Sequence, residues 1–221
     1  MEREDDGIEN EFPQLKARIE ELNRIIKMEH QSSKETYEMI KEISKKFDII
    51  SFKADRISDY SDRIAKDREE SEKKGIFERP EYESEVSDNI IDELERSIKE
   101  LEKLIEACEK KMKDHEEDIN DYPSDISELK DKIQSFTSKN PSYQNESDMM
   151  LKIINEVEKN YEVLVKKFNV SKQLLEDYKS GKNQTKEFLT KLRSVINLEI
   201  SLKLNLFYLH HPEEVKNRRK K

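Results

Sequence analysis

The stretch from Ile91 to Phe136 reads IDELERSIKE LEKLIEACEK KMKDHEEDIN DYPSDISELK DKIQSF, and it decides the fold class. Mostly apolar residues return along it in alternating steps of three and four, and the positions between them are largely Glu, Asp, Lys and Ser. These seam positions are Ile91, Leu94, Ile98, Leu101, Ile105, Cys108, Met112, His115, Ile119, Tyr122, Ile126, Leu129, Ile133 and Phe136. A repeat of about 3.5 residues places one narrow stripe on a helix, as in a coiled coil. The stretch therefore predicts a long helix that packs against other helices.

The composition of the whole chain agrees with long helices. Of its 221 residues, 42% are charged and 33% are hydrophobic, with three glycines and no tryptophan. Low glycine with abundant Glu, Lys, Leu and Ile is typical of coiled coils. High charge with low hydrophobicity also marks disordered chains, but a disordered chain has no reason to preserve a seam. We therefore predict an all-α protein with three long antiparallel coiled-coil helices and a fourth, apolar helix near the C-terminus.

A similar seam follows an acidic lead-in at 1–7 and predicts a first helix over about residues 8–73. Its apolar positions are Ile8, Phe12, Leu15, Ile19, Leu22, Ile26, Ile40, Ile43, Phe47, Ile50, Ala54, Ile57 and Ile64. In the gap before Ile40 the same count falls on Glu29, Ser33 and Thr36. Polar seam residues of this kind can fix the register of packed helices at some cost in stability. We favour the other interpretation, in which packing passes to residues beside the seam, namely Met28, His30 and Tyr37.

The middle of the chain predicts a second helix over about residues 85–136, between two loops at 74–84 and 137–147. Gly75 suits a helix C-terminus, Pro80 blocks continuation, and Ser84 is a candidate N-cap. Pro123 interrupts the second helix but leaves the seam count unshifted. We expect a kink or a short break that keeps the helix direction. Two separate helices meeting at 120–124 are the alternative.

The last third of the chain predicts a helix over about 147–179, capped by Ser147, and a further helix over about 184–209. The break between them is expected at Ser180-Gly181-Lys182-Asn183, because glycine is costly inside a helix. Residues 198–206 alternate between apolar and polar types, which is also a strand pattern, but leucine is a poor strand former and we expect a helix. The segment 8–211 is thus expected to form a single elongated helical bundle, followed by a basic tail at 212–221.

Nothing in the sequence predicts catalysis, a cofactor or a metal site. Cys108 and His115 are seven residues apart, whereas zinc ligands usually lie two to four apart, so both are expected to be buried seam residues. His210 and His211 form a lone pair after a helix end. Gly-rich phosphate loops and nucleophile motifs are missing. We therefore expect a protein that is not an enzyme.

The distribution of charge indicates which classes of partner are favoured. The net charge of −9 disfavours nucleic acid and anionic membranes as general partners. The tail from Lys216 to Lys221 has five basic residues in six, and such clusters serve as nuclear-import signals or as contacts to acidic partners. Its candidate contact residues are Arg218, Arg219, Lys220 and Lys221. With an acidic N-terminus, one cysteine and no long apolar run, we expect a cytoplasmic location, with a nuclear one as the alternative.

The segment 188–209 is the most apolar part of the chain, and it has the greatest need of a partner. Its candidate interface residues are Phe188, Leu192, Val195, Ile196, Leu202, Leu206 and Leu209. A helix that is apolar nearly all round must be buried in a bundle or in an interface. We therefore expect a non-enzymatic coiled-coil scaffold or assembly subunit that dimerises or joins a larger helical complex.

Three long antiparallel helices in a chain of 221 residues, with a kinked middle helix, resemble the BAR-type architecture. The resemblance covers helix number, length and kink, and it implies a dimeric module that binds curved anionic membranes through basic patches. Lysines flank the second loop, where such domains carry basic tips: Lys130, Lys132, Lys139 and Lys152. The net charge of −9 and the acidic second helix depart from the electrostatics of that family.

Overall fold

A computed structural model describes residues 5–214, with side chains described from Glu11 onward. It contains three long helices, α1 (Asp5–Lys74), α2 (Glu81–Lys139) and α3 (Gln144–His210), and a short 3₁₀ helix, η1 (Pro141–Tyr143). The described residues contain no strand, and residues 198–206 lie inside α3. The predicted fold class, an all-α bundle of three long antiparallel helices, is confirmed.

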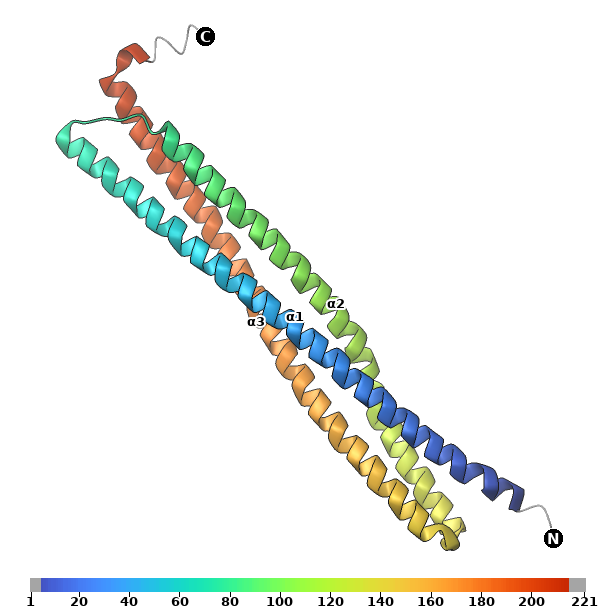
Figure 1. The fold of residues 1–221 in the computed structure, drawn as a ribbon. Helices are drawn as coiled ribbons and strands as arrows, with labels where there is room; N and C mark the ends of the chain where they lie inside the picture. The colour runs from blue at the N-terminus through green and yellow to red at the C-terminus, as the bar shows by residue number, and fades with distance from the viewer. Residues whose placement is uncertain (1–4, 215–221) are drawn as a thin grey trace. The chain divides into compact units, whose positions relative to one another are not determined.

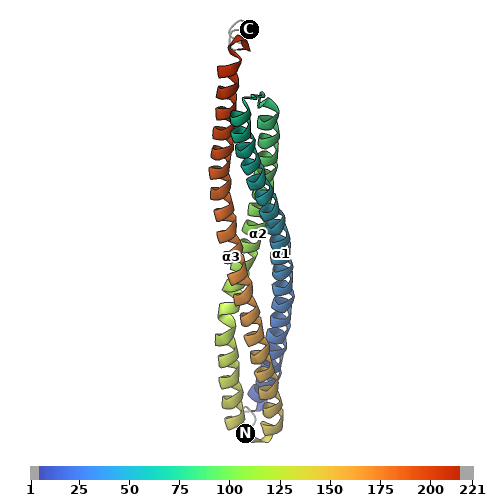
Figure 2. The ribbon, with the colours of Figure 1, turned by 90° about the vertical axis from the view of Figure 1, so that its left-hand side faces the viewer.

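The three helices contribute to two compact units, and every helix supplies one segment to each unit. The first unit consists of residues 1–41 and 106–175, and the second unit of residues 42–105 and 176–221. Within each unit the α2 segment runs antiparallel to the α1 and α3 segments (Figures 1 and 2). The turn between α2 and α3 belongs to the first unit, and the turn between α1 and α2 to the second.

The α2 seam is buried as the sequence predicts. All fourteen seam positions from Ile91 to Phe136 are buried, including Cys108 and His115. Burial raises the pKa of the Cys108 thiol to about 11, so this thiol stays protonated near neutral pH. The period of the sequence therefore identifies the face of α2 that packs against the other helices.

The polar part of the α1 seam is buried too, and the interpretation favoured from the sequence was wrong. Ser33 is buried and Thr36 is only 2% exposed, whereas Met28 beside the seam is 56% exposed. The count of three and four thus describes the packing even where it falls on polar residues. In the first unit these residues form a polar layer, which consists of Glu29, Ser33 and Thr36 of α1, His115 of α2 and Ser171 of α3.

His115 is the centre of the polar layer. Its Nδ1 lies 2.6 Å from Oε2 of Glu29, and its Nε2 contacts the hydroxyl of Ser32. A neutral imidazole satisfies both contacts if Nδ1–H donates to the carboxylate and Nε2 accepts from the hydroxyl. The layer is therefore hydrogen-bonded around His115, and it provides the kind of polar contact that fixes helix register.

The turn between α1 and α2 confirms Gly75 as a helix terminator but not Ser84 as a cap. Gly75 has φ of 66°, and the N–H of Ile76 donates to the carbonyl of Ser71 over 3.1 Å, as in a Schellman motif. α2 begins at Glu81, because Pro80 tolerates a helix start and its carbonyl accepts the N–H of Ser84. Ser84 therefore lies within the first helical turn.

The turn between α2 and α3 is much shorter than the loop expected at 137–147. α2 continues to Lys139, η1 follows, and α3 begins at Gln144, so Ser147 lies inside the helix and is buried rather than capping it. Three aromatic rings pack together here, with centroid distances of 5.6–5.9 Å between Phe12, Phe136 and Tyr143. Their packing explains why this turn is compact.

Neither helix breaker ends a helix. Pro123 lies inside α2, and the break expected at 180–183 is absent, so residues 184–209 form the end of α3 rather than a separate helix. A Cβ atom on Gly181 would lie only 2.7 Å from Cζ of Phe47, whose ring packs against Tyr178. Glycine at position 181 therefore leaves the space that the Phe47 ring occupies. The signal for a continuous helix is the unshifted count Leu175, Tyr178, Lys182, Thr185, Leu189, Leu192, Ile196.

The contact between Gly181 and Phe47 predicts a strong coupling between these two positions. Gly181→Ala alone is expected to lower the free energy of unfolding by about 1 kcal/mol, because the displaced ring outweighs the better helix propensity of alanine. In a Phe47→Ala background the same change is expected to raise it by about 1 kcal/mol. Urea unfolding of the natural chain, of each single variant and of the double variant measures the coupling free energy. Additive effects would show that the ring does not require glycine.

Candidate interaction surface

The C-terminal part of α3, in the second unit, has two apolar faces. One face packs into the unit through buried Leu189, Leu192, Ile196 and Ile200. The other face is an outer stripe that consists of Phe188, Val195, Leu198, Leu202 and Leu209. Four of these residues are spaced by seven, and Leu198 lies one turn after Val195. The helix thus presents a second coiled-coil type seam beside its packed one.

The outer stripe is accessible in the second unit. The exposed fraction is 47% for Val195 and 72% for Leu209, and Phe188 and Leu198 are exposed as well. Leu202 is half-buried. Single exposed apolar residues are ordinary in proteins, but an aligned row of them marks an interaction site. The row therefore identifies the face of α3 that lacks a packing partner in this structure.

From Ser194 onward, the flanks of the outer stripe carry almost no charge. Between Ser194 and Leu209 the only acidic or basic residues are Glu199 and Lys203. Both turn into the second unit, where their side chains are 16% and 12% exposed. In a chain that is 42% charged, this depletion is unusual. Loss of charge is the compositional mark of an interface centre.

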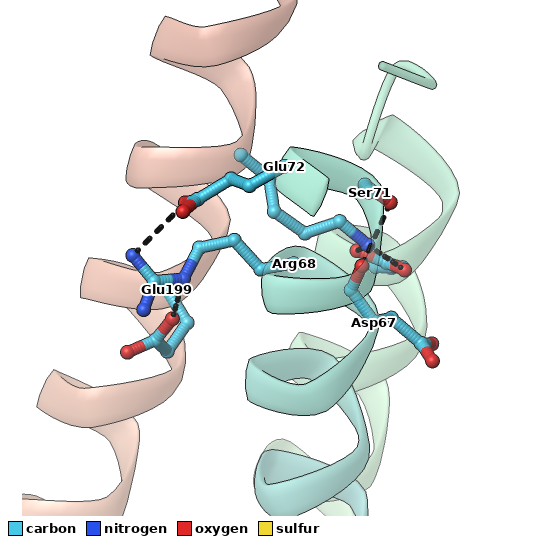
Figure 3. A network of polar contacts seen from close by, with 7 residues as sticks. Asp67, Arg68, Ser71, Glu72 and Glu199 are labelled. Atoms are coloured by element: carbon cyan, nitrogen blue, oxygen red, sulfur yellow. Dashed lines mark hydrogen bonds and ion pairs between the residues drawn. The ribbon is translucent and has the colours of Figure 1, made fainter. Parts of the chain in front are cut away.

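Specific partners hold these two charges inward. Glu199 faces Arg68 of α1, with Oε2 2.8 Å from Nε, and Arg68 also approaches Glu72 at 3.5 Å (Figure 3). Lys203 donates to both carboxylate oxygens of Glu83 in α2, over 2.8 and 3.1 Å. Sequence reasoning missed both residues because it counted only apolar positions. The count of three and four after Ile196 falls on Glu199 and then on Lys203.

The structure divides the predicted interface residues into two sets. Leu192 and Ile196 are buried in the second unit, while Phe188, Val195, Leu202 and Leu209 belong to the outer stripe. Leu206 is half-buried between the two faces. Leu198, 58% exposed, was not predicted. The sequence therefore identified the apolar segment but not which of its faces is free.

The predicted basic contacts differ in whether their charge is already paired. Lys130 donates to Glu158 over 2.6 Å, and Lys132 donates to Glu128. Lys139 and Lys152 are exposed. Arg218, Arg219, Lys220 and Lys221 lie outside the described residues. At most two of the four lysines near the turn between α2 and α3 thus offer an uncompensated charge.

The histidines and acids of the described chain do not gather into a metal site. His210 stacks on Phe77 with ring centroids 3.9 Å apart, and His211 stacks on Phe207 at 4.6 Å. Within residues 5–214, no group of three His, Cys, Asp or Glu side chains has the arrangement of a metal centre. Over the same residues, none of the helices combines the length and apolarity that crossing a membrane requires.

Comparisons with known proteins add no functional relative. No family model and no curated protein matches the chain. A similar solved structure is a computationally designed three-helix bundle, which is 14% identical in sequence. The match covers 96% of this chain and 99% of that chain, with a TM-score of 0.31. A likeness at this level carries no argument about function.

Proposed function

We propose that this protein is a non-enzymatic assembly subunit, which pairs with a second copy of itself along the outer stripe of α3. The observation that carries the proposal is the stripe itself, a row of exposed apolar side chains at coiled-coil spacing, from Phe188 to Leu209, without free charge at its flanks beyond Ser194. Covering these side chains removes apolar surface from water, which is the main driving force of association.

A second copy fits the stripe in an antiparallel orientation. A parallel pair would place Lys191 beside Lys191 of the second copy, because this residue occupies the seam position between Phe188 and Val195. Like charges across a seam are unfavourable. An antiparallel pair centred on Leu198 instead places Lys191 opposite Asn205. Lys191 is the one charged residue at a stripe position, so the antiparallel pair brings no like charges together across the stripe.

The expected affinity is moderate. Complete burial of a large apolar side chain contributes about 1.5–3 kcal/mol, and the stripe residues are already covered in part. Five such side chains from each copy then contribute on the order of 10 kcal/mol. Association itself costs about 4–15 kcal/mol. At the lower end of this cost the net free energy of association is about −6 kcal/mol, so we expect weak dimers with a dissociation constant of about 40 µM or higher, which dissociate on dilution.

Sedimentation equilibrium between about 1 and about 200 µM tests this function. The natural chain is expected to change from monomer to dimer over this range. V195E/L198E, which places two acids on the stripe, is expected to stay monomeric at every concentration. The matched control I49E/F52E replaces exposed apolar residues of α1 in the same unit and is expected to dimerise normally. A monomeric natural chain, or equal behaviour of both variants, would contradict the proposal.

The alternative function is a dimeric BAR-like module that binds curved membranes. Helix number and order support it, but two of its four candidate lysines are already ion-paired. Co-sedimentation with anionic vesicles at low salt separates the two functions. Under our proposal the chain stays in the supernatant, and pelleting that disappears at high salt would favour the membrane module. We propose a cytoplasmic location, with the basic tail as the reason to consider a nuclear one.

A further inference from the structure

A groove of about 450 Å³ opens between α1 and α3 in the first unit, at the level of the polar layer. Its buried lining residues are Ser33 and Ser171, which occupy seam positions that elsewhere hold large apolar side chains. Small side chains at these positions leave room that the other helices do not fill. The volume lies within the range of small-molecule sites, about 300–1,000 Å³.

The groove is lined by cations without acids. Lys34 of α1 and Lys166 and Lys167 of α3 line it, and no carboxylate does. Among residues 11–214, none of these three lysines forms an ion pair. Other lysines of the same unit are paired: Lys111 lies 2.5 Å from Glu35, and Lys172 lies 2.7 Å from Glu116. In a chain of net charge −9, three uncompensated cations around one groove create a local attraction for anions.

The hydroxyls of two serines add hydrogen-bonding capacity. Ser33 is 9% exposed and Ser171 is 4% exposed, and both line the groove. Within the described part of the chain, neither side chain forms a hydrogen bond. Neither oxygen is among the buried polar atoms that lack a partner, so both hydroxyls are open to the groove and free to bond to water or to a ligand there. The two hydroxyls can therefore donate hydrogen bonds to a polar group of a ligand inside the groove.

The remaining lining supplies an apolar surface. The exposed side chains of Tyr37 and Val170 lie on opposite helices and line the same groove. We propose that the groove binds a small organic anion, whose carboxylate, sulfonate or phosphate group contacts the lysines and the serine hydroxyls. The apolar body of this ligand rests on Tyr37 and Val170. This site is separate from the outer stripe and does not depend on self-association.

Fluorescence titration with 8-anilinonaphthalene-1-sulfonate tests the site, with neutral N-phenyl-1-naphthylamine as the matched probe. The V195E/L198E background removes binding of the dye to the outer stripe. The anionic probe is expected to bind at one site, at least tenfold more tightly than the neutral probe. K166Q/K167Q is expected to raise the dissociation constant of the anionic probe at least tenfold. K27Q/K159Q removes the same charge from exposed positions of the first unit outside the groove, and binding is expected to persist.

A second variant tests the space rather than the charge. Ser171→Leu fills the groove while every lysine remains, and it is expected to abolish binding of the anionic probe. Circular dichroism verifies that this variant keeps its helices; if it does not, Ser171→Val serves as the smaller replacement. Equal affinity for both probes would overturn the proposal. So would binding that survives both K166Q/K167Q and the filled groove, because the dye would then lie elsewhere.

Discussion

Replacement of Glu29 and His115 together by leucine is expected to raise the free energy of unfolding by about 1–3 kcal/mol. Replacement of His115 alone by leucine is expected to lower it by about 2 kcal/mol. The two changes differ because the first removes the whole buried pair, while the second leaves a mostly buried carboxylate without its partner. The polar layer is thus expected to cost stability while each of its members is individually needed.

The geometry of the pair explains the size of these effects. Glu29 Oε2 lies 2.6 Å from His115 Nδ1, and the side chains are 14% and 11% exposed. A carboxylate so enclosed loses most of its hydration, and His115 supplies the compensating hydrogen bond. Leucine at both positions would make the apolar seam of α2 continuous through the layer and would extend that of α1 by one position, up to Ser33. The gain in the free energy of unfolding comes from the burial of two apolar side chains at positions that already face the packed helices.

Urea unfolding followed by circular dichroism measures both variants. The matched control is E35Q/K111Q, because Glu35 and Lys111 form an ion pair between the same two helices that is much more exposed. Exposed pairs contribute little, so this control is expected to leave the unfolding midpoint nearly unchanged. A less stable double leucine variant would contradict the prediction. It would show that the space around the layer is too small for leucine.

Much of the fold follows from the period of the sequence, because burial on a helix recurs every three to four residues. Ile91 to Phe136 could therefore be assigned to a packed face without any structure. The errors arose where apolarity and burial separate. Thr36 is polar and buried, and Met28 is apolar and exposed, so a count of apolar residues misplaced the packing between Ile26 and Ile40.

The candidate surface was predictable only in part. The segment 188–209 is apolar nearly all round, and its sequence alone does not say which face the other two helices cover. Arg68 and Glu83 decide this, because they draw Glu199 and Lys203 into the second unit and leave the opposite face uncharged. These partners lie on other helices. A reading of α3 by itself could not have identified them.

Replacement of Pro123 by alanine is expected to raise the free energy of unfolding by about 1–3 kcal/mol. Proline in a helix interior removes one hydrogen bond and clashes with the preceding turn, at a cost of about 3 kcal/mol. In α2 the carbonyl left without its usual donor is that of Ile119. Alanine restores the donor and fits any exposed helical position.

The contrast with Gly181 is what makes this prediction specific. Gly181 is covered by the ring of Phe47, so its replacement must move a packed side chain. Pro123 is exposed, while its neighbours Tyr122 and Ile126 carry the packing of α2 in the first unit. An added methyl group at Gly181 therefore meets an obstacle, whereas a smaller side chain at Pro123 meets none.

Urea unfolding again supplies the measurement, with Ser124→Ala as a control at the neighbouring exposed position. The control is expected to change stability by less than about 0.5 kcal/mol, because it alters helix propensity alone. Amide exchange near Ile119 and Pro123 is expected to slow in Pro123→Ala, since the helix regains a hydrogen bond there. A destabilised Pro123→Ala protein would mean that the buried neighbours need the backbone shape that proline imposes. Pro123 would then serve the packing of the first unit, as Gly181 serves that of the second.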